Sequence, residues 1–552
     1  MSTRTSNPRV AAKPPGRTRA ETAPAEASPV LTLDYSLASL PSAQHRAGLA
    51  GLVLMLKWLT RLPEKTRGIA RILHLDDAGA RVELDLEGMR RLFDELYAAS
   101  MEEQKESQPR KDEPPLREEE VEQTDAKGKV KRKKYFIYKV PVPRAGLLLD
   151  HAPGANDAGL WVKLWRDMLW RTLRGVPATR LPFIARAQGT DNGDAEKAWK
   201  RLTSKKAGTV QLSSTDYLGA MDRNADGVSF EDAPREWFLL HFWPYVTQVH
   251  VPRALKLKDK VIQEAHAGFA LVIPDVGLLQ SFCEELPHAL RERSTEVSGF
   301  RPRAALVDLV EESALMTGRL LRERLSQTEG ARAYSALVLG YELVHLDKDG
   351  NNVRTYSASR FEPTVSMVDE YQALQHPALW DPLFRRTRLQ NLVGGRPWYA
   401  GFDRIASTLP YTATFGTKGF RHDARVSFER SKDMDSSESA ATGPGLEQLV
   451  LQVAGTYVRR KLKLKHGLEW ESAKDNPKEK AEYEKGKERI ARDAFLAVRS
   501  RTGADFIAYF AGTLCSVPHH LKAEQFVRLS RALHERTEDV RTLTLLALSA
   551  TA

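Results

Sequence analysis

The stretch from Leu31 to Leu62 constrains the fold more than any other part of the chain. Its apolar residues first alternate from Leu31 to Tyr35, which predicts a short strand. Residues 39–42 (Ser-Leu-Pro-Ser) then supply hydroxyls for a helix N-cap and a proline for the first turn. Residues 49–59 are apolar at helical spacing. We therefore expect a strand followed by a mostly buried helix, with small residues on one side where another backbone can pack closely.

The first turns of this helix contain His45 and Arg46, ahead of an almost entirely apolar sequence. A helix N-terminus presents free N–H groups and the positive end of its dipole, so these residues predict a phosphate-binding site. The alternative interpretation is an ordinary core helix whose polar first turn is solvated.

Length and charge limit the classes of protein that this chain can represent. A chain of 552 residues is too long for one core and predicts two or three domains. A formal net charge of +11 favours an anionic partner such as nucleic acid. Two cysteines exclude a disulfide framework and a four-cysteine zinc site, which fits a cytoplasmic protein. No run of 18 apolar residues exists, so we expect no membrane partner.

Patterns along the chain predict an α+β fold, a mixed multidomain protein with a C-terminal helical bundle. Strand and helix patterns intermingle up to residue 431, whereas the last 107 residues show helical spacing only. The predicted domains are a disordered basic tail (1–29), an N-terminal α+β segment (30–100), a charged disordered linker (101–134), a central α+β domain (135–431), a flexible linker (432–445) and a helical bundle (446–552).

Three further groups of residues are candidates for contact with nucleic acid. The charged linker ends in a basic run that is either a solvated loop or a flexible arm for phosphates. A predicted helix at 160–173 carries a basic face, and residues 459–465 of the bundle hold five cations in seven positions. The candidate phosphate-binding residues of these three groups are Lys131, Arg132, Lys133, Lys134, Arg166, Arg171, Arg459, Arg460, Lys461, Lys463 and Lys465.

A predicted β-hairpin turn at residues 347–350 is followed by Asn351, Asn352 and Arg354. These side chains could reach a groove edge or a nucleic-acid backbone. Asparagine is equally the residue that a left-handed turn requires, so the alternative is a purely structural turn.

The sequence gives no catalytic residues, no metal site and no cofactor motif. Residues 222–227 resemble the start of an EF-hand calcium loop, but Ala233 stands where the bidentate glutamate is needed. His422-Asp423 lacks the further ligands of a metal phosphohydrolase, and Cys515 with His519 lacks partners for a zinc site or a nucleophile. We expect a protein that is not an enzyme.

Five stretches, in order along the chain, resemble the large subunit of type I CRISPR interference complexes (Cascade), in a Myxococcus-type, DevT-like subfamily. They are LPSAQHRAGLAGL from Leu40, LWVKLWRDMLWRTLRGVPATR from Leu160, EWFLLHFWPYVTQVHVPRAL from Glu236, HLDKDGNNVRTYS from His345 and FIAYFAGTLCSVPHHL from Phe506.

The resemblance implies a non-catalytic subunit of a surveillance complex in antiviral defence. Such a subunit binds the 5′ end of the CRISPR guide RNA beside the Cascade backbone and guide-end-capping subunits. It inspects the protospacer-adjacent motif of target double-stranded DNA and leaves cleavage to a recruited helicase-nuclease. Two alternatives stay open: a developmental regulator in fruiting body formation and sporulation, which the DevT likeness implies, and a basic scaffold for protein partners.

Overall fold

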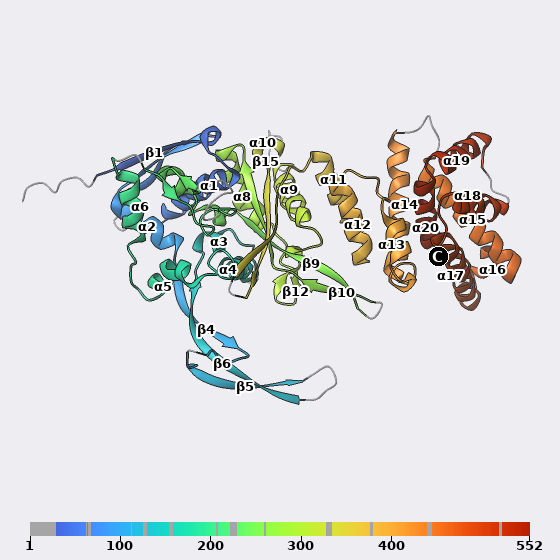
Figure 1. Ribbon diagram of the computed structural model, residues 1–552, viewed down its shortest axis with the longest axis horizontal. Coiled ribbons are helices and arrows are strands. Elements are labelled where there is room, and N and C mark those ends of the chain that lie inside the picture. The colour runs from blue at the N-terminus through green and yellow to red at the C-terminus, as the bar shows by residue number, and fades with distance from the viewer. Residues whose placement is uncertain are drawn as a thin grey trace, which may run out of the picture.

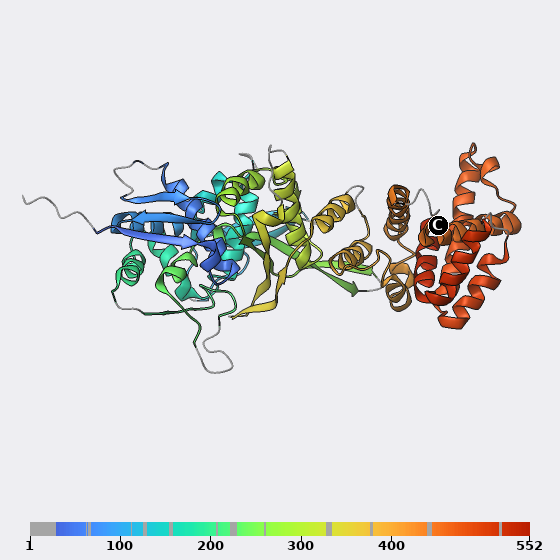
Figure 2. The ribbon, with the colours of Figure 1, turned by 90° about the horizontal axis from the view of Figure 1, so that it is seen from above.

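The computed structural model describes residues 29–61, 63, 68–111, 113–124, 130–153, 158–205, 208–220, 229–258, 261–326, 334–350, 352–375, 379–438, 444–517 and 521–552. The basic tail predicted for 1–29 lies outside this part of the chain, apart from residue 29. The molecule is elongated, with a mixed half at one end and an all-helical half at the other (Figures 1 and 2). The fold is α+β, as the sequence predicted.

Helix α1 (Ala43–Leu59) lies at the centre of the mixed half, and Ser42 caps its N-terminus. Strand β1 (Leu31–Ser36) leads into it and pairs antiparallel with β3 (Gly79–Leu84), which pairs with β2 (Ala70–Leu75). Helix α2 (Leu86–Leu96) follows β3. The predicted strand and buried helix are confirmed.

Two glycines let α1 approach the chain between α7 (Pro234–Leu239) and the 3₁₀-turn η4 (Trp243–Tyr245). A Cβ atom built on Gly48 would lie 2.3 Å from the carbonyl oxygen of Leu239, and one on Gly51 would lie 2.3 Å from that of Phe242. Both carbonyls belong to backbone that cannot move without disturbing the core.

Replacing Gly48 with alanine is expected to lower the free energy of unfolding by about 1–3 kcal/mol, because the clash outweighs the gain in helix propensity. Denaturant unfolding of the full chain measures this change. Gly455→Ala is the matched control, because its Cβ would meet nothing closer than the Thr551 hydroxyl at 3.9 Å. Equal stability of the two variants would contradict the close approach.

The central sheet has the order β10-β9-β11-β15-β16, with β14 (Leu306–Val307) parallel to β9. Its strands are β9 (Gln248–Lys258), β10 (Val261–His266), β11 (Phe269–Val276), β15 (Val338–Asp349) and β16 (Asn352–Phe361). The hairpin predicted at residues 347–350 is confirmed by the pairing of β15 with β16. Strand β11 continues through Pro274, which lies opposite Tyr341.

The prediction of a disordered linker at 101–134 is wrong for its described residues. They form an arm that projects from the body (Figure 1), built from β4 (Ala99–Glu106), β5 (Arg117–Thr124) and β6 (Val130–Pro143) in the order β4-β6-β5. Acidic residues of β5 lie beside basic residues of β6, so antiparallel pairing neutralises both runs. Scarcity of apolar residues therefore did not prevent strand formation here.

The remaining helices and strands complete the mixed half. They are α3 (Gly146–Asp150), α4 (Ala158–Arg171), α5 (Leu181–Ala187), α6 (Asp194–Thr203), α8 (Leu279–Arg291), α9 (Val310–Ser326), α10 (Tyr334–Leu337), α11 (Val365–Leu374), β7 (Val210–Gln211), β8 (Glu231–Asp232), β12 (Val297–Ser298) and β13 (Arg301–Pro302).

The helical half contains a second core. Its helices are α12 (Pro382–Val393), α13 (Phe402–Thr408), α14 (Lys418–Glu438), α15 (Leu446–His466), α16 (Trp470–Ala473), α17 (Pro477–Arg499), α18 (Gly503–Gly512), α19 (Ala523–Glu535) and α20 (Thr537–Thr551). Helix α20 lies in the middle and contacts α14, α15 and α17.

The two cores meet within α12, not at the linker predicted for 432–445. Leu389 and Leu392 of this helix belong to the first core, and Phe384 belongs to the second. Helix α14 packs on α20 and extends to Glu438, so part of the predicted linker is helical. The boundary was misplaced because a change in composition marks a loop, whereas a core boundary depends on which helices pack together.

Candidate nucleic-acid interface

The two residues of the phosphate site predicted at the start of α1 are paired with carboxylates of the protein itself. His45 is 3% exposed, and its Nε2 lies 2.6 Å from a carboxylate oxygen of Asp232. Arg46 forms an ion pair with the buried Asp275 at 2.5 Å. His45 and Arg46 therefore join α1 to β8 and β11. The helix start is neither a phosphate site nor the solvated turn of the alternative interpretation.

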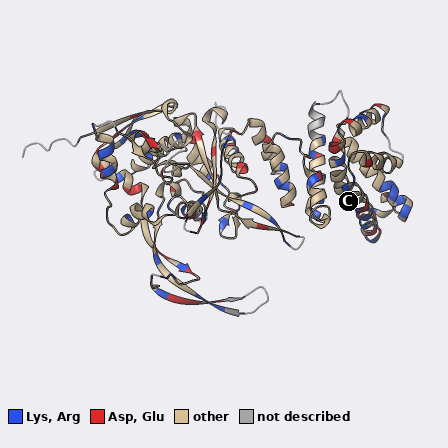
Figure 3. Ribbon diagram, in the orientation of Figure 1, with Lys and Arg blue, Asp and Glu red and all other residues tan. Residues whose placement is uncertain are grey.

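The basic run of the arm is largely neutralised. Lys134 pairs with Glu118 at 2.5 Å, and Arg132 pairs with Glu122 at 3.1 Å. Lys133 lies over the ring of Tyr135 at 5.3 Å. The side chain of Lys131 lies outside the described residues. Figure 3 shows the alternation of acidic and basic ribbon along the arm. Most of this charge is balanced within the sheet, which weakens the case for phosphate binding there.

Arg166 and Arg171 do not form one open basic face. Arg166 donates a hydrogen bond to the carbonyl oxygen of Arg144 at 2.7 Å, and partial burial lowers the pKa of its guanidinium. Arg171 pairs with Asp347 at 2.8 Å. Both guanidinium groups hold neighbouring elements of the mixed half together.

Of the predicted hairpin residues, Asn351 lies outside the described part of the chain, as do residues 222–227 of the EF-hand-like stretch. Asn352 lines a cavity of about 620 Å³ between the hairpin and the end of α4. Arg354 lies over the ring of Tyr356, 5.6 Å from its centroid, and 3.9 Å from a carboxylate oxygen of Asp349. The turn residues thus have structural partners, and their contact with nucleic acid stays a prediction.

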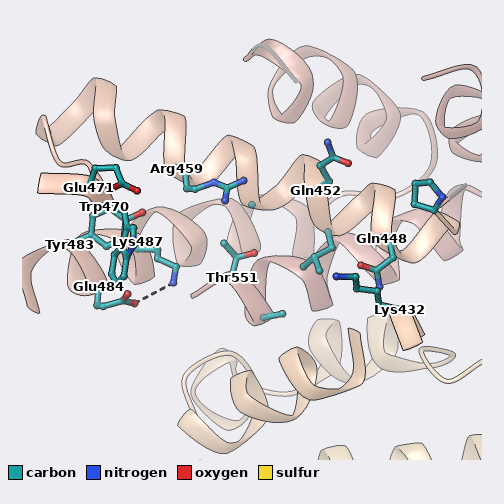
Figure 4. A pocket seen from close by; sticks show the side chains of 14 residues that line it. Lys432, Gln448, Gln452, Arg459, Trp470, Glu471, Tyr483, Glu484, Lys487 and Thr551 are labelled. Carbon is teal, nitrogen blue, oxygen red and sulfur yellow. Dashed lines mark hydrogen bonds and ion pairs between the residues drawn. The ribbon is translucent and has the colours of Figure 1, made fainter. Parts of the chain in front are cut away.

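A cavity of about 970 Å³ lies in the helical half (Figure 4). We call it the C-terminal groove. It is bounded by α14, α15, α16, α17 and α20. The groove is lined by Lys432, Pro444, Gln448, Leu451, Gln452, Gly455, Arg459, Trp470, Glu471, Tyr483, Glu484, Lys487, Ala550 and Thr551.

Of the five cations in the predicted basic run of α15, only Arg459 lines this groove. Arg459 lines it and forms no ion pair within the described residues. Lys461 lies over the ring of Tyr457 at 5.7 Å, and Lys463 pairs with Glu469 at 2.5 Å. The exposed side chains of Arg460 and Lys465 do not line the groove and make no ion pair in the described part of the chain. The helix spreads the five cations around its axis, as 3.6 residues per turn require.

The two ends of the groove differ in chemistry (Figure 4). At one end Trp470, 41% exposed, lies with its ring centroid 5.4 Å from that of Tyr483. Burial raises the pKa of the Tyr483 hydroxyl, and the positive charge of Arg459 opposes that rise. At the other end lie Lys432 and Gln448. Aromatic rings, amides and cations in one groove match the bases and phosphates of nucleic acid.

Two acidic residues, Glu471 and Glu484, also line the groove, and their negative charge could offset that of its cations. Glu484 is paired with Lys487 at 3.2 Å, and Glu471 is paired with Lys474 at 2.7 Å. Both carboxylates therefore have cationic partners. Arg459 and Lys432 then dominate the electrostatics of the groove.

Comparison with known families decides the identity. The model of the type I-B CRISPR Cas8b N-terminal domain matches residues 69–331, and that of the type I-B CRISPR Cas8b C-terminal domain matches residues 338–551. Together the two models cover most of the chain, in their natural order. The chain belongs to the Cas8b family. It is thus a type I-B CRISPR large subunit, which confirms the predicted Cascade large subunit; the Myxococcus-type subfamily stays a prediction. No curated protein matches the chain.

The C-terminal groove lies wholly within the part that matches the Cas8b C-terminal domain. Sequence reasoning found Arg459 but missed Lys432, Gln448, Trp470 and Lys487. Trp470 carried a signal, because a tryptophan in the polar run Glu469–Lys474 has few apolar neighbours to pack against. Lys432 carried none, because only the packing of α14 beside α15 brings it to this Cas8b groove.

His422 and Asp423, which resembled part of a catalytic site, have structural partners in this Cas8b chain. Asp423 is buried and accepts hydrogen bonds from the backbone N–H groups of Trp380 and Asp381, while the His422 ring stacks on that of Trp380 at 3.6 Å. His519 lies outside the described residues. Within the described ranges, no three His, Cys, Asp or Glu side chains gather closely enough to hold a metal ion, and no helix has the length and apolar content to cross a bilayer.

Proposed function

We propose that this Cas8b subunit binds the 5′ end of the guide RNA and the target DNA within Cascade, as a non-catalytic member of the complex in the cytoplasm. It inspects the protospacer-adjacent motif beside the backbone and guide-end-capping subunits, and a recruited helicase-nuclease cuts the DNA. The family supports the place in the complex, and the net charge of +11 supports an anionic partner.

The C-terminal groove carries the proposal for DNA. Its cations suit phosphates, and Trp470 offers a ring face at the surface. Bases within a duplex already stack on one another, so a ring of this kind binds an unpaired base, to which stacking contributes about 1–3 kcal/mol. We therefore assign the groove to a single strand exposed when the target duplex opens.

Isolation of the assembled complex tests the function. Co-expression with the other Cascade subunits is expected to yield a particle that contains short RNA, and sequencing should identify that RNA as guide. A developmental role in fruiting body formation and sporulation, implied by the DevT likeness, would act through the same particle. Recovery of this subunit with protein partners but without RNA would instead favour the basic scaffold.

Arg459→Gln is expected to weaken binding of single-stranded DNA by about five- to tenfold and to lower the slope of log affinity against log salt concentration by about 0.7, the value for one phosphate contact. Fluorescence anisotropy of the full chain measures both quantities. Lys485→Gln on α17 removes the same charge from an exposed position outside the groove lining. Equal losses in both variants would contradict the assignment of the strand to the groove.

A further inference from the structure

A smaller cavity, of about 290 Å³, also lies in the mixed half and plays no part in the proposed function. Its walls come from α2, α5, α6 and α7, with the loops at 174–179 and 215–216. The exposed Leu181 and its neighbour Pro182 supply an apolar side, and none of the residues predicted as nucleic-acid contacts lines the cavity. The volume is close to the lower limit of about 300 Å³ for small-molecule sites.

Two donors that line this cavity have no hydrogen-bond partner. The Nε2 atom of His241 and the Nε atom of Arg174 are both buried and unpaired in the described part of the chain. Nδ1 of His241 lies 2.6 Å from the hydroxyl of Tyr97. We find no second acceptor for that hydroxyl among the described residues, so the hydroxyl donates to Nδ1. The proton of the neutral ring then resides on Nε2.

The imidazole is neutral near pH 7, because burial lowers the pKa of His241 to about 4. The charged groups that act on it are Asp216, Arg174, Asp194 and Arg201. A buried donor without an acceptor costs about 1–3 kcal/mol, so two of them at one cavity call for a ligand that brings acceptors.

The remaining charges at the cavity favour an anion. Lys197 and Arg201 of α6 line it and form no ion pair within the described residues. Asp194 is held by Arg186 at 2.8 Å, so it does not neutralise them. Asp216 accepts a hydrogen bond from Ser213 at 2.9 Å on one oxygen, which leaves the other for a hydroxyl group. Unpaired donors and cations exclude a metal ion and suit phosphate oxygens.

We propose that this cavity binds a free nucleoside monophosphate. Its phosphate lies toward Lys197, Arg201, Arg174 and His241, its ring lies against Leu181 and Pro182, and a ribose hydroxyl donates to Asp216. Inorganic phosphate would satisfy only the donors, and a nucleoside would satisfy only the apolar side and the carboxylate. The site lies in the half opposite to the C-terminal groove, so it does not depend on the proposed function.

Calorimetric titration of the full chain with adenosine monophosphate, inorganic phosphate and adenosine tests the proposal. Adenosine monophosphate is expected to bind at least tenfold more tightly than either of the other two probes. Lys197→Met should weaken that binding about five- to tenfold, the range for loss of one charge-assisted contact. Lys200→Met is the matched control, because it removes an exposed lysine from the same helix outside the cavity lining.

Arg174→Lys keeps the positive charge but removes the Nε donor, and it is expected to weaken binding without lowering the unfolding temperature of the free protein. Absence of binding by adenosine monophosphate at millimolar concentration would overturn the proposal. Equal affinities of Lys197→Met and Lys200→Met would also overturn it, as would phosphate binding as tightly as the nucleotide. Single-stranded DNA binding should be unchanged in Lys197→Met, which separates this site from the groove.

Discussion

Replacement of Arg385 by methionine is expected to lower the free energy of unfolding by about 3 kcal/mol, the largest effect on stability that we expect from one substitution. Arg385 of α12 forms ion pairs with Asp308 and Glu312, whose side chains are 1% and 0% exposed. The methionine would leave two buried carboxylates short of their shared cation. Arg253 still pairs with Asp308 at 2.6 Å, which limits the loss.

Urea unfolding of the full chain measures this change, with fluorescence following both halves. Arg386→Met is the control, because the neighbouring arginine is half-buried and forms no ion pair in the described part of the chain. Loss of stability in the control alone, or in neither variant, would show that the cluster at Arg385 does not stabilise the junction between the cores.

Simultaneous reversal of three charges, Lys432→Glu, Arg459→Glu and Lys487→Glu, is expected to weaken target DNA binding by the assembled complex at least a hundredfold. All three cations line the C-terminal groove. Loss of the phosphate contacts of Arg459 and Lys432 on a single strand should lower the salt slope by about 1.4, and the reversed charges, that of Lys487→Glu among them, add repulsion. Affinity at several salt concentrations gives both numbers.

A control with the same total charge separates the groove from the general basicity of the protein. Lys478→Glu, Lys485→Glu and Arg489→Glu change three exposed positions of α17 that do not line the groove. We expect this control to lose less than tenfold in affinity. A comparable loss in both triple variants would mean that the groove holds no strand and that only net charge matters.

Local sequence patterns predicted the buried helices and strands well, but they did not predict which charged surface residues pair with one another. The buried helix at α1 and the hairpin of β15 and β16 followed from apolar spacing and turn residues, because these depend on near neighbours in the chain. The arm was missed because its strands are stabilised by ion pairs such as Glu118–Lys134, which periodicity does not reveal.

The residues of the candidate site were likewise hard to predict, because their partners are distant in the sequence. His45 and Arg46 are residue types that often bind phosphate. In the structure their side chains are instead paired with Asp232 and Asp275, which come from distant parts of the chain. Arg459 was found because it lies in a dense run of cations. Its neighbours in the groove come from α15 and from four other helices, and their convergence depends on how α14 and α17 pack on α15. A single sequence carries little information about such packing.

The placement of α14 in the second core bears on where this polypeptide can be divided. A fragment starting at Leu446 would lack α14, whose Phe420 and Phe428 belong to that core, and would expose part of the apolar surface of α20 to water. A C-terminal piece that keeps all residues of the second core must therefore begin upstream of Pro382, so that it includes α12 to α14. Translation from an internal start between α14 and α15 would give a product prone to aggregate unless another chain supplied the missing helices.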